Sequence, residues 1–407
     1  MDLACRRGIV ADVRRALARG EDVNQRDDYG CSALFIACLQ GHAPVARLLL
    51  EHGANVHQTE NNGWSPLSIA SHQGRVQVAR LLLHYGADVD ETMCDGASPI
   101  YIVSQQGHAE IARLLLDHGA DLHQARNGAV SPLHASCQKG HLAVARLLLE
   151  RGADVHQTAI DGASPLFIAS QQGHTEIVRL LLEHGSDVHL ARNDGISALF
   201  IASQNGRVDV VRQLLDQGAN VHQSIICGAT PLYIASQNGH AEVARVLLDH
   251  DADIHLARND GASPLFAASK SGHAEVAHLL FNHGANLHQS GHDGASPLVI
   301  ATYCNHAEIV HLLLARGADA CQTTNKGASP LFIACARGYD DVARVLLDHG
   351  ADLHQANNCG ITPLDAARRY GRASIVQLLL SHCPKHDVMC LLIGDETDNI
   401  IPHKILS

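Results

Sequence analysis

Asp161-Gly162-Ala163-Ser164-Pro165-Leu166-Phe167-Ile168-Ala169, followed by Gly173-His174, is the clearest copy of a unit that repeats through nearly all of the chain. The proline of this unit recurs at a step of 33, at positions 66, 99, 132, 165, 231, 264, 297, 330 and 363, and alanine holds its place at Ala33 and Ala198. A period between 20 and 50 residues is typical of solenoid proteins, whose single units cannot bury their apolar faces alone. The register therefore predicts a stack of similar supersecondary elements.

Each unit contains the signals of two helices. Ser or Thr precedes every proline position, as at Ser164 and Thr362, and this pair of residues favours a helix start because the hydroxyl caps a free amide and proline needs no donor at the first turn. A glycine such as Gly173 should end this first helix in a left-handed conformation. A second helix follows, with apolar residues at helical spacing. Its acidic residue stands three before an arginine, an order that favours ion pairing, in Glu110/Arg113, Glu176/Arg179 and Glu242/Arg245.

These motifs resemble the ankyrin repeat. The family's Thr-Pro-Leu-His-x-Ala corresponds to Ser164-Pro165-Leu166-Phe167-Ile168-Ala169, and its Gly-Ala-Asp-Val-Asn to Gly152-Ala153-Asp154-Val155-His156. The resemblance implies an all-α, ankyrin-type helical solenoid of helix-turn-helix pairs with short hairpin loops, with eleven repeats after an N-terminal cap. We expect a capping repeat at 1–28, ten tandem repeats at 29–359, a C-terminal helix pair at 360–383 and a non-repeat tail at 384–407.

Three residues depart from the glycine pattern. Ala129 and Asp251 replace loop and helix-ending glycines, and Asn305 replaces the glycine between two helices. Each substitution should cost roughly 0.5–1 kcal/mol if the backbone there has a positive φ.

The composition indicates a soluble, folded chain. It is 46% hydrophobic and 18% charged, and no apolar run approaches the roughly 20 residues of a membrane span. The N-terminus shows no secretory signal, and the 12 cysteines form no disulfide framework, so we expect a monomer in the cytosol or nucleus. A net charge of −12 argues against nucleic acid as the main partner, because phosphate binding needs a basic stripe.

Catalytic and cofactor motifs are not apparent. The chain has no phosphate-binding loop, no His-Glu-x-x-His and no Gly-x-Ser-x-Gly. We therefore expect no enzyme, no catalytic residue, no metal site and no cofactor.

Histidine is unusually common, with 30 residues, most of them in three ladders of 33-residue spacing. One ladder lies in the hairpin segment (as at His156), one in the Gly-His turn (as at His174) and one at the end of the second helix (as at His184). Packed helices lie roughly 8–10 Å apart, which is too far for two rungs to share a zinc ion at about 2.0–2.1 Å from each. We expect hydrogen bonds in the turns and hairpins, with a pH response as the alternative.

Two further patterns have alternative explanations. Aromatic residues recur at one position of the first helix and should lie in the core between repeats, or else form a binding stripe: Phe35, Tyr101, Phe167, Phe200, Tyr233, Phe266 and Phe332. The stretch His382-Cys383-Pro384-Lys385-His386, with Cys390, holds several candidate zinc ligands, but its spacing fits a helix end stopped by Pro384 better.

In proteins with this resemblance, the hairpin finger tips carry recognition. Most tips here are polar, and the apolar exceptions are our candidate partner-binding residues: Tyr29, Trp64, Met93, Ile160, Ile225 and Ile226. Aromatic residues are over-represented among interface hot spots, whereas isolated exposed apolar residues are common on any surface.

The function we predict is that of a non-catalytic scaffold or adaptor, which binds protein partners through the finger tips and the concave face of the first helices. Small and polar residues on that face, such as Ser170, Ser203, Ser236 and the glutamine after each, suit a hydrogen-bonding groove. The alternative is a substrate receptor of a ubiquitin ligase, with residues 384–407 as the recruiting element. Because 24 residues are short for such an element, we expect them first of all to cap the end of the stack.

Overall fold

The computed structural model describes residues 1–382, in two units, Met1–Ile225 (unit 1) and Ile226 onward (unit 2). The described residues form 24 helices. The only β-type pairing within them consists of three isolated bridges, Arg26 with Ser32, Arg126 with Val130 and Ala191 with Ser197. The prediction of an all-α solenoid is thereby confirmed.

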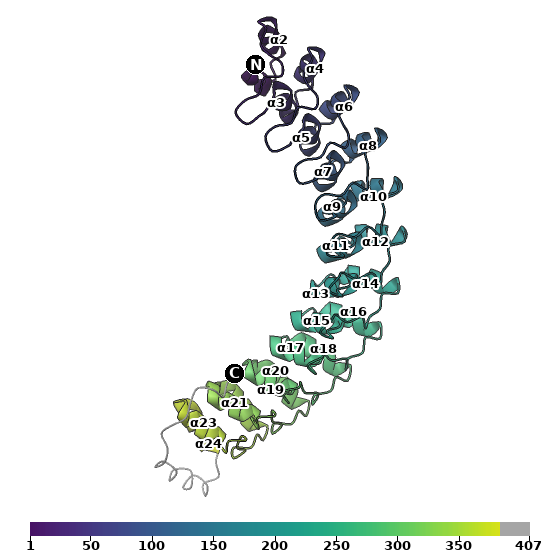
Figure 1. The fold of residues 1–407 in the computed structure, drawn as a ribbon. Helices are drawn as coiled ribbons and strands as arrows, with labels where there is room; N and C mark the ends of the chain where they lie inside the picture. Colours follow the sequence, from purple (N-terminus) through teal and green to yellow (C-terminus); the bar gives the residue numbers. More distant parts are fainter. Residues whose placement is uncertain (383–407) are drawn as a thin grey trace. The chain divides into compact units, whose positions relative to one another are not determined.

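The helices come in pairs, and within each unit the first helices form one layer and the second helices another (Figure 1). The first helices are α1 (Asp2–Arg7), α3 (Ala33–Gln40), α5 (Pro66–His72), α7 (Pro99–Gln106), α9 (Pro132–Lys139), α11 (Pro165–Gln172) and α13 (Ala198–Gln204) in unit 1, and α15 (Pro231–Asn238), α17 (Pro264–Ser271), α19 (Pro297–Tyr303), α21 (Pro330–Arg337) and α23 (Pro363–Arg369) in unit 2.

The second helices are α2 (Val10–Ala18), α4 (Ala43–Glu51), α6 (Val76–His84), α8 (Ala109–Asp117), α10 (Leu142–Glu150), α12 (Thr175–Glu183) and α14 (Val208–Asp216) in unit 1, and α16 (Ala241–Asp249), α18 (Ala274–Asn282), α20 (Ala307–Ala315), α22 (Asp340–Asp348) and α24 (Ala373–His382) in unit 2. Within a unit, first helices pack on first helices and second helices on second helices, for example α7 on α9 and α18 on α20.

The predicted helix caps are present. From α3 on, the hydroxyl of the Ser or Thr before each first helix accepts a hydrogen bond from the amide three residues later, as from Phe167 to Ser164 at 3.1 Å. The glycines predicted between the helices all have positive φ, and the three substituted positions do too: Ala129 (59°), Asp251 (62°) and Asn305 (62°). These three residues therefore carry the backbone strain that the sequence predicted.

The core lies between the two layers. Every member of the aromatic column is buried, which confirms its assignment to the interior. The groove prediction was wrong for the serines, because Ser170, Ser203 and Ser236 are completely buried. Ser203 Oγ donates to Leu199 O and Ser236 Oγ to Leu232 O, both at 2.7 Å. Because all three serines are buried, their hydroxyls are not available to a partner.

Candidate functional site

The finger is the five-residue segment before each first helix, for example Glu60–Trp64 and Ala159–Ala163. The amide of its first residue donates to the carbonyl of its fifth, from Glu60 to Trp64 at 3.0 Å and from Ala159 to Ala163 at 2.9 Å. A carboxylate or amide side chain usually closes the loop, as where Asp161 Oδ1 accepts from the Ala163 amide at 3.1 Å. Each finger is thus a hydrogen-bonded turn and not a loose loop.

Successive fingers are also bonded to one another. In unit 1 the Ile160 amide donates to Gly128 O at 3.0 Å, and Asn193 Nδ2 donates to Ile160 O at the same distance. In unit 2 Asn259 Nδ2 donates to Ile226 O at 3.0 Å. These bonds cross from one repeat to the next, so the backbone at Ile160 is fixed on both sides and the backbone at Ile226 is fixed by the repeat that follows it.

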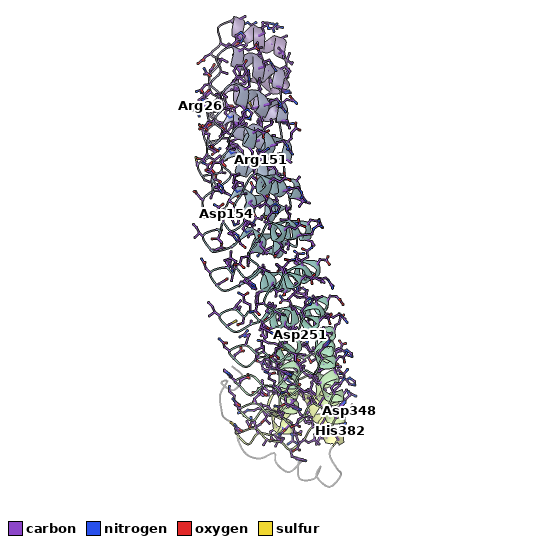
Figure 2. The ribbon with its side chains drawn as sticks, turned by 90° about the vertical axis from the view of Figure 1, so that its right-hand side faces the viewer. Arg26, Arg151, Asp154, Asp251, Asp348 and His382 are labelled. Carbon is purple, nitrogen blue, oxygen red and sulfur yellow. The ribbon has the colours of Figure 1, made fainter. Side chains whose placement is uncertain are left out.

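Arginines at the bases of alternate fingers strengthen this edge. The guanidinium groups of Arg126, Arg192 and Arg258 lie 5.4–5.6 Å from the ring centres of the aromatic residues 25 positions earlier. Arg126 also pairs with Asp95 at 2.8 Å. The hydrogen bond from Arg192 lowers the pKa of the Asp194 carboxyl. Arg26, on the finger edge of unit 1 in Figure 2, donates to Thr59 O at 2.9 Å.

Three of the six candidate partner-binding residues are fully presented to solvent. Tyr29 is 75% exposed, Ile160 74% and Ile226 82%. No other large hydrophobic side chain among residues 1–382 is as exposed as these three. Their side chains point outward from bonded backbone, which is the arrangement that a recognition tip requires.

The other three, Trp64, Met93 and Ile225, are half-buried. Trp64 and Met93 pack against a buried cluster that includes Tyr101 and Ile102, and the Trp64 ring meets the His72 ring edge to face at 5.2 Å. These two residues therefore help to seat a finger on the first helices. The sequence did not separate the two groups, although Trp64 and Met93 stand at the ends of their fingers and Ile160 and Ile226 at the second position.

Two histidine ladders make the predicted hydrogen bonds through their rings. Nε2 of His141 lies 3.0 Å from Gln105 O, 36 residues earlier, and His306 repeats this contact with Lys270 O at 3.1 Å. At the helix ends Nδ1 lies near the carbonyl four residues back, as in His52 with Leu48 at 2.8 Å. In the hairpin ladder the bonded group is the backbone amide: His156 donates to Asp154, labelled in Figure 2, at 2.8 Å.

The candidate metal ligands and the buried cysteine thiols can be placed in the structure. Residues 1–382 contain no group of three His, Cys, Asp or Glu side chains that could hold a metal. Burial raises the pKa of Cys5 to about 11 and of Cys335 to about 12, so these thiols stay protonated near neutral pH. His382 bonds to Leu378 O at 2.9 Å and lies 3.9 Å from Asp348, within the helix end (Figure 2). The other proposed zinc ligands, at 383, 386 and 390, lie outside the described residues.

The ion pairs predicted in the second helices form in two of three cases. Glu176 pairs with Arg179, and Glu242 with Arg245 at 3.4 Å, whereas Glu110 lies 3.9 Å from Arg80 of the preceding repeat. No helix of residues 1–382 combines the length and apolarity that a bilayer crossing would require.

Comparison with known proteins agrees with the geometry. A family model of ankyrin repeats, in three copies, matches six overlapping segments, residues 1–93, 86–159, 153–225, 219–291, 254–324 and 298–390. No curated protein matches the chain closely enough to serve as a relative.

Proposed function

Because the chain belongs to the ankyrin repeat family, whose repeats are in general protein–protein interaction modules, we propose that it is a non-catalytic scaffold that binds partner proteins through its finger tips. The observation that carries this proposal is the placement of the most exposed apolar side chains. Tyr29, Ile160 and Ile226, the three most exposed large apolar residues of the described part of the chain, all lie on fingers.

The energetics support recognition at these positions. Burying an isoleucine side chain contributes about 1.5–3 kcal/mol, and the bonds from Asn193 and Asn259 already fix the backbone at Ile160 and Ile226. Little conformational entropy is therefore lost at the tip when a partner docks. The polar residues around the tips supply hydrogen bonds and specificity.

The substrate-receptor alternative depends on residues 384–407, which lie outside the described residues. Trp64 and Met93 stay in the proposed surface as residues at its base, where a partner that contacts a tip would touch their exposed edges.

Affinity purification followed by titration of one purified partner tests the proposal. We expect Ile160→Ser or Ile226→Ser to weaken at least one partner by about 1–2 kcal/mol, or roughly 5- to 30-fold. Leu3→Ser and Tyr85→Ser are controls, because these exposed apolar residues lie away from the fingers, Leu3 on α1 and Tyr85 directly after α6. Equal affinities for all partners, or equal losses in tip and control variants, would remove the finger tips from the binding surface.

A further inference from the structure

The second helices of unit 2 line a hollow that is separate from the fingers. It lies over α16, α18 and α20 and has a volume of about 620 Å³. Ala241, Ala274, Leu279 and Leu312 supply its apolar lining, and its charged lining consists of Arg245, Glu275 and Glu308. Its size falls within the range of about 300–1,000 Å³ that is usual for binding pockets.

The hollow coincides with a change in the repeat. The neighbouring second helices α16 and α22 carry arginine at their fifth position, as Arg245 and Arg344, and Arg245 pairs with Glu242 at 3.4 Å. In α18 and α20 the same position is His278 and His311. These two helices therefore lack the cation that the pattern supplies to their neighbours.

Two carboxylates remain without a counter-charge as a result. Glu275 and Glu308 both line the hollow and are exposed, and neither makes an ion pair with any residue from 1 to 382. The nearby histidines are engaged elsewhere. Arg316 lies 3.3 Å from His278 Nε2, and the His311 ring meets the His349 ring edge to face at 5.6 Å.

We propose that this hollow binds a lysine or arginine side chain presented by a protein partner. The aliphatic stem of such a side chain would lie on Ala274 and Leu312, and its charged end between Glu275 and Glu308. Long basic side chains commonly combine these two contacts. Packed helices are roughly 8–10 Å apart. The carboxylates of α18 and α20 would therefore lie on either side of one basic residue of the partner, and a second residue close to it in the partner's sequence would also be within their reach. This surface lies on the second helices, and its existence does not depend on the finger tips.

A labelled hexapeptide with two arginines three positions apart is the probe, and the same peptide with glutamines in their place is its reference. Anisotropy with the full chain should show binding of the arginine peptide alone, weakening as salt rises. Glu275→Gln with Glu308→Gln should weaken it about tenfold. The matched control, Glu110→Gln with Glu176→Gln, removes the same charge from equivalent positions in unit 1 and should change affinity less than twofold.

A second variant tests the mechanism without removing either glutamate. His278→Arg with His311→Arg introduces the residue found at this position in the neighbouring helices α16 and α22, and it should weaken binding of the peptide as much as the glutamine variant does. Three results would overturn the proposal: no binding of the arginine peptide, an equal loss in the unit 1 control (general attraction to an acidic chain), or wild-type affinity after the histidine replacements. Circular dichroism of each variant establishes that the helices are retained.

Discussion

Units 1 and 2 are built from the same repeat but depart from it at different sets of positions. Unit 1 changes at its first helices and finger bases, with His134 in the aromatic column and Trp64 at a position that elsewhere holds a smaller residue. Unit 2 also changes in that column, at Val299 and Asp365, and it changes in addition at its second helices and their ends, with His278, His311 and Asp251. The inward changes should act on stability, whereas the outward changes should act on what the surface can bind.

His134 is a fully buried departure in unit 1. It is only 2% exposed, Nδ1 lies 2.7 Å from Ser131 Oγ, and Nε2 lies 3.0 Å from the carbonyl of Ala163 in the next repeat. His134→Ala would leave a cavity and take away the acceptor of the buried Ser131 amide, so we expect unit 1 to lose roughly 3 kcal/mol of unfolding free energy. Hydrogen exchange, which reports the two units separately, should show faster exchange in α9 and α11 than in any helix of unit 2.

The control for this prediction is His134→Phe. Phe167 and Phe200 hold the equivalent position in the next two repeats and are buried there, so phenylalanine should cost much less than alanine. If the two variants were equally unstable, the hydrogen bonds of the imidazole would account for the whole effect, and cavity volume would contribute nothing.

Trp64 offers a weaker test of the same contrast. Its packing against Tyr101 and Ile102 is only partial, so Trp64→Ala should lower the stability of unit 1 by about 2 kcal/mol, less than a fully buried tryptophan would. The exposed Ile160 should change stability by less than about 0.5 kcal/mol when truncated. Thermal unfolding of both variants checks this pair. A Trp64 variant as stable as the Ile160 variant would make Trp64 a surface residue after all.

The helix boundaries and the core positions of the repeat could be predicted from sequence, because they depend on local residue patterns that recur every 33 residues. The Ser164 cap, the positive φ of Asp251 and the burial of Phe167 all follow from the residue and its immediate neighbours. The burial of Ser170 and the seating of Trp64 could not be predicted, since they depend on the direction of a side chain relative to an adjoining repeat. The hollow beside Glu275 depends likewise on three successive helices.

Acidification should also distinguish the units. Burial lowers the pKa of His134 below its usual 6.5, and burial with the nearby His108 lowers the pKa of His72. Below about pH 6.5 these histidines bind protons more readily in the unfolded chain than in the folded unit 1. The unfolding free energy of unit 1 should therefore fall as the pH falls. The loss should be smaller than that of the alanine variant, because the imidazole keeps its hydrogen bonds while it remains neutral. Denaturant unfolding from pH 7.5 to 5 should show this slope, and His134→Phe should reduce it.

The smallest expected effect concerns the left-handed ends of the second helices. A Cβ built on Gly119, Gly185 or Gly218 meets nothing within 4 Å, whereas one built on Gly140, in the turn between two helices, would lie 2.7 Å from the His174 ring. The helix-end position therefore has room for a side chain, and the cost of Asp251, at φ 62°, is backbone strain alone.

Asp251→Gly should accordingly stabilise unit 2 by up to about 1 kcal/mol. The reverse change at the equivalent position of unit 1, Gly218→Asp, should destabilise that unit by a similar amount. Equal and opposite shifts in the unfolding midpoint would show that strain at this position is the same in both units. A lower midpoint for Asp251→Gly would mean that the carboxylate makes an interaction worth more than the strain, and the outward departures of unit 2 would then stabilise it as well.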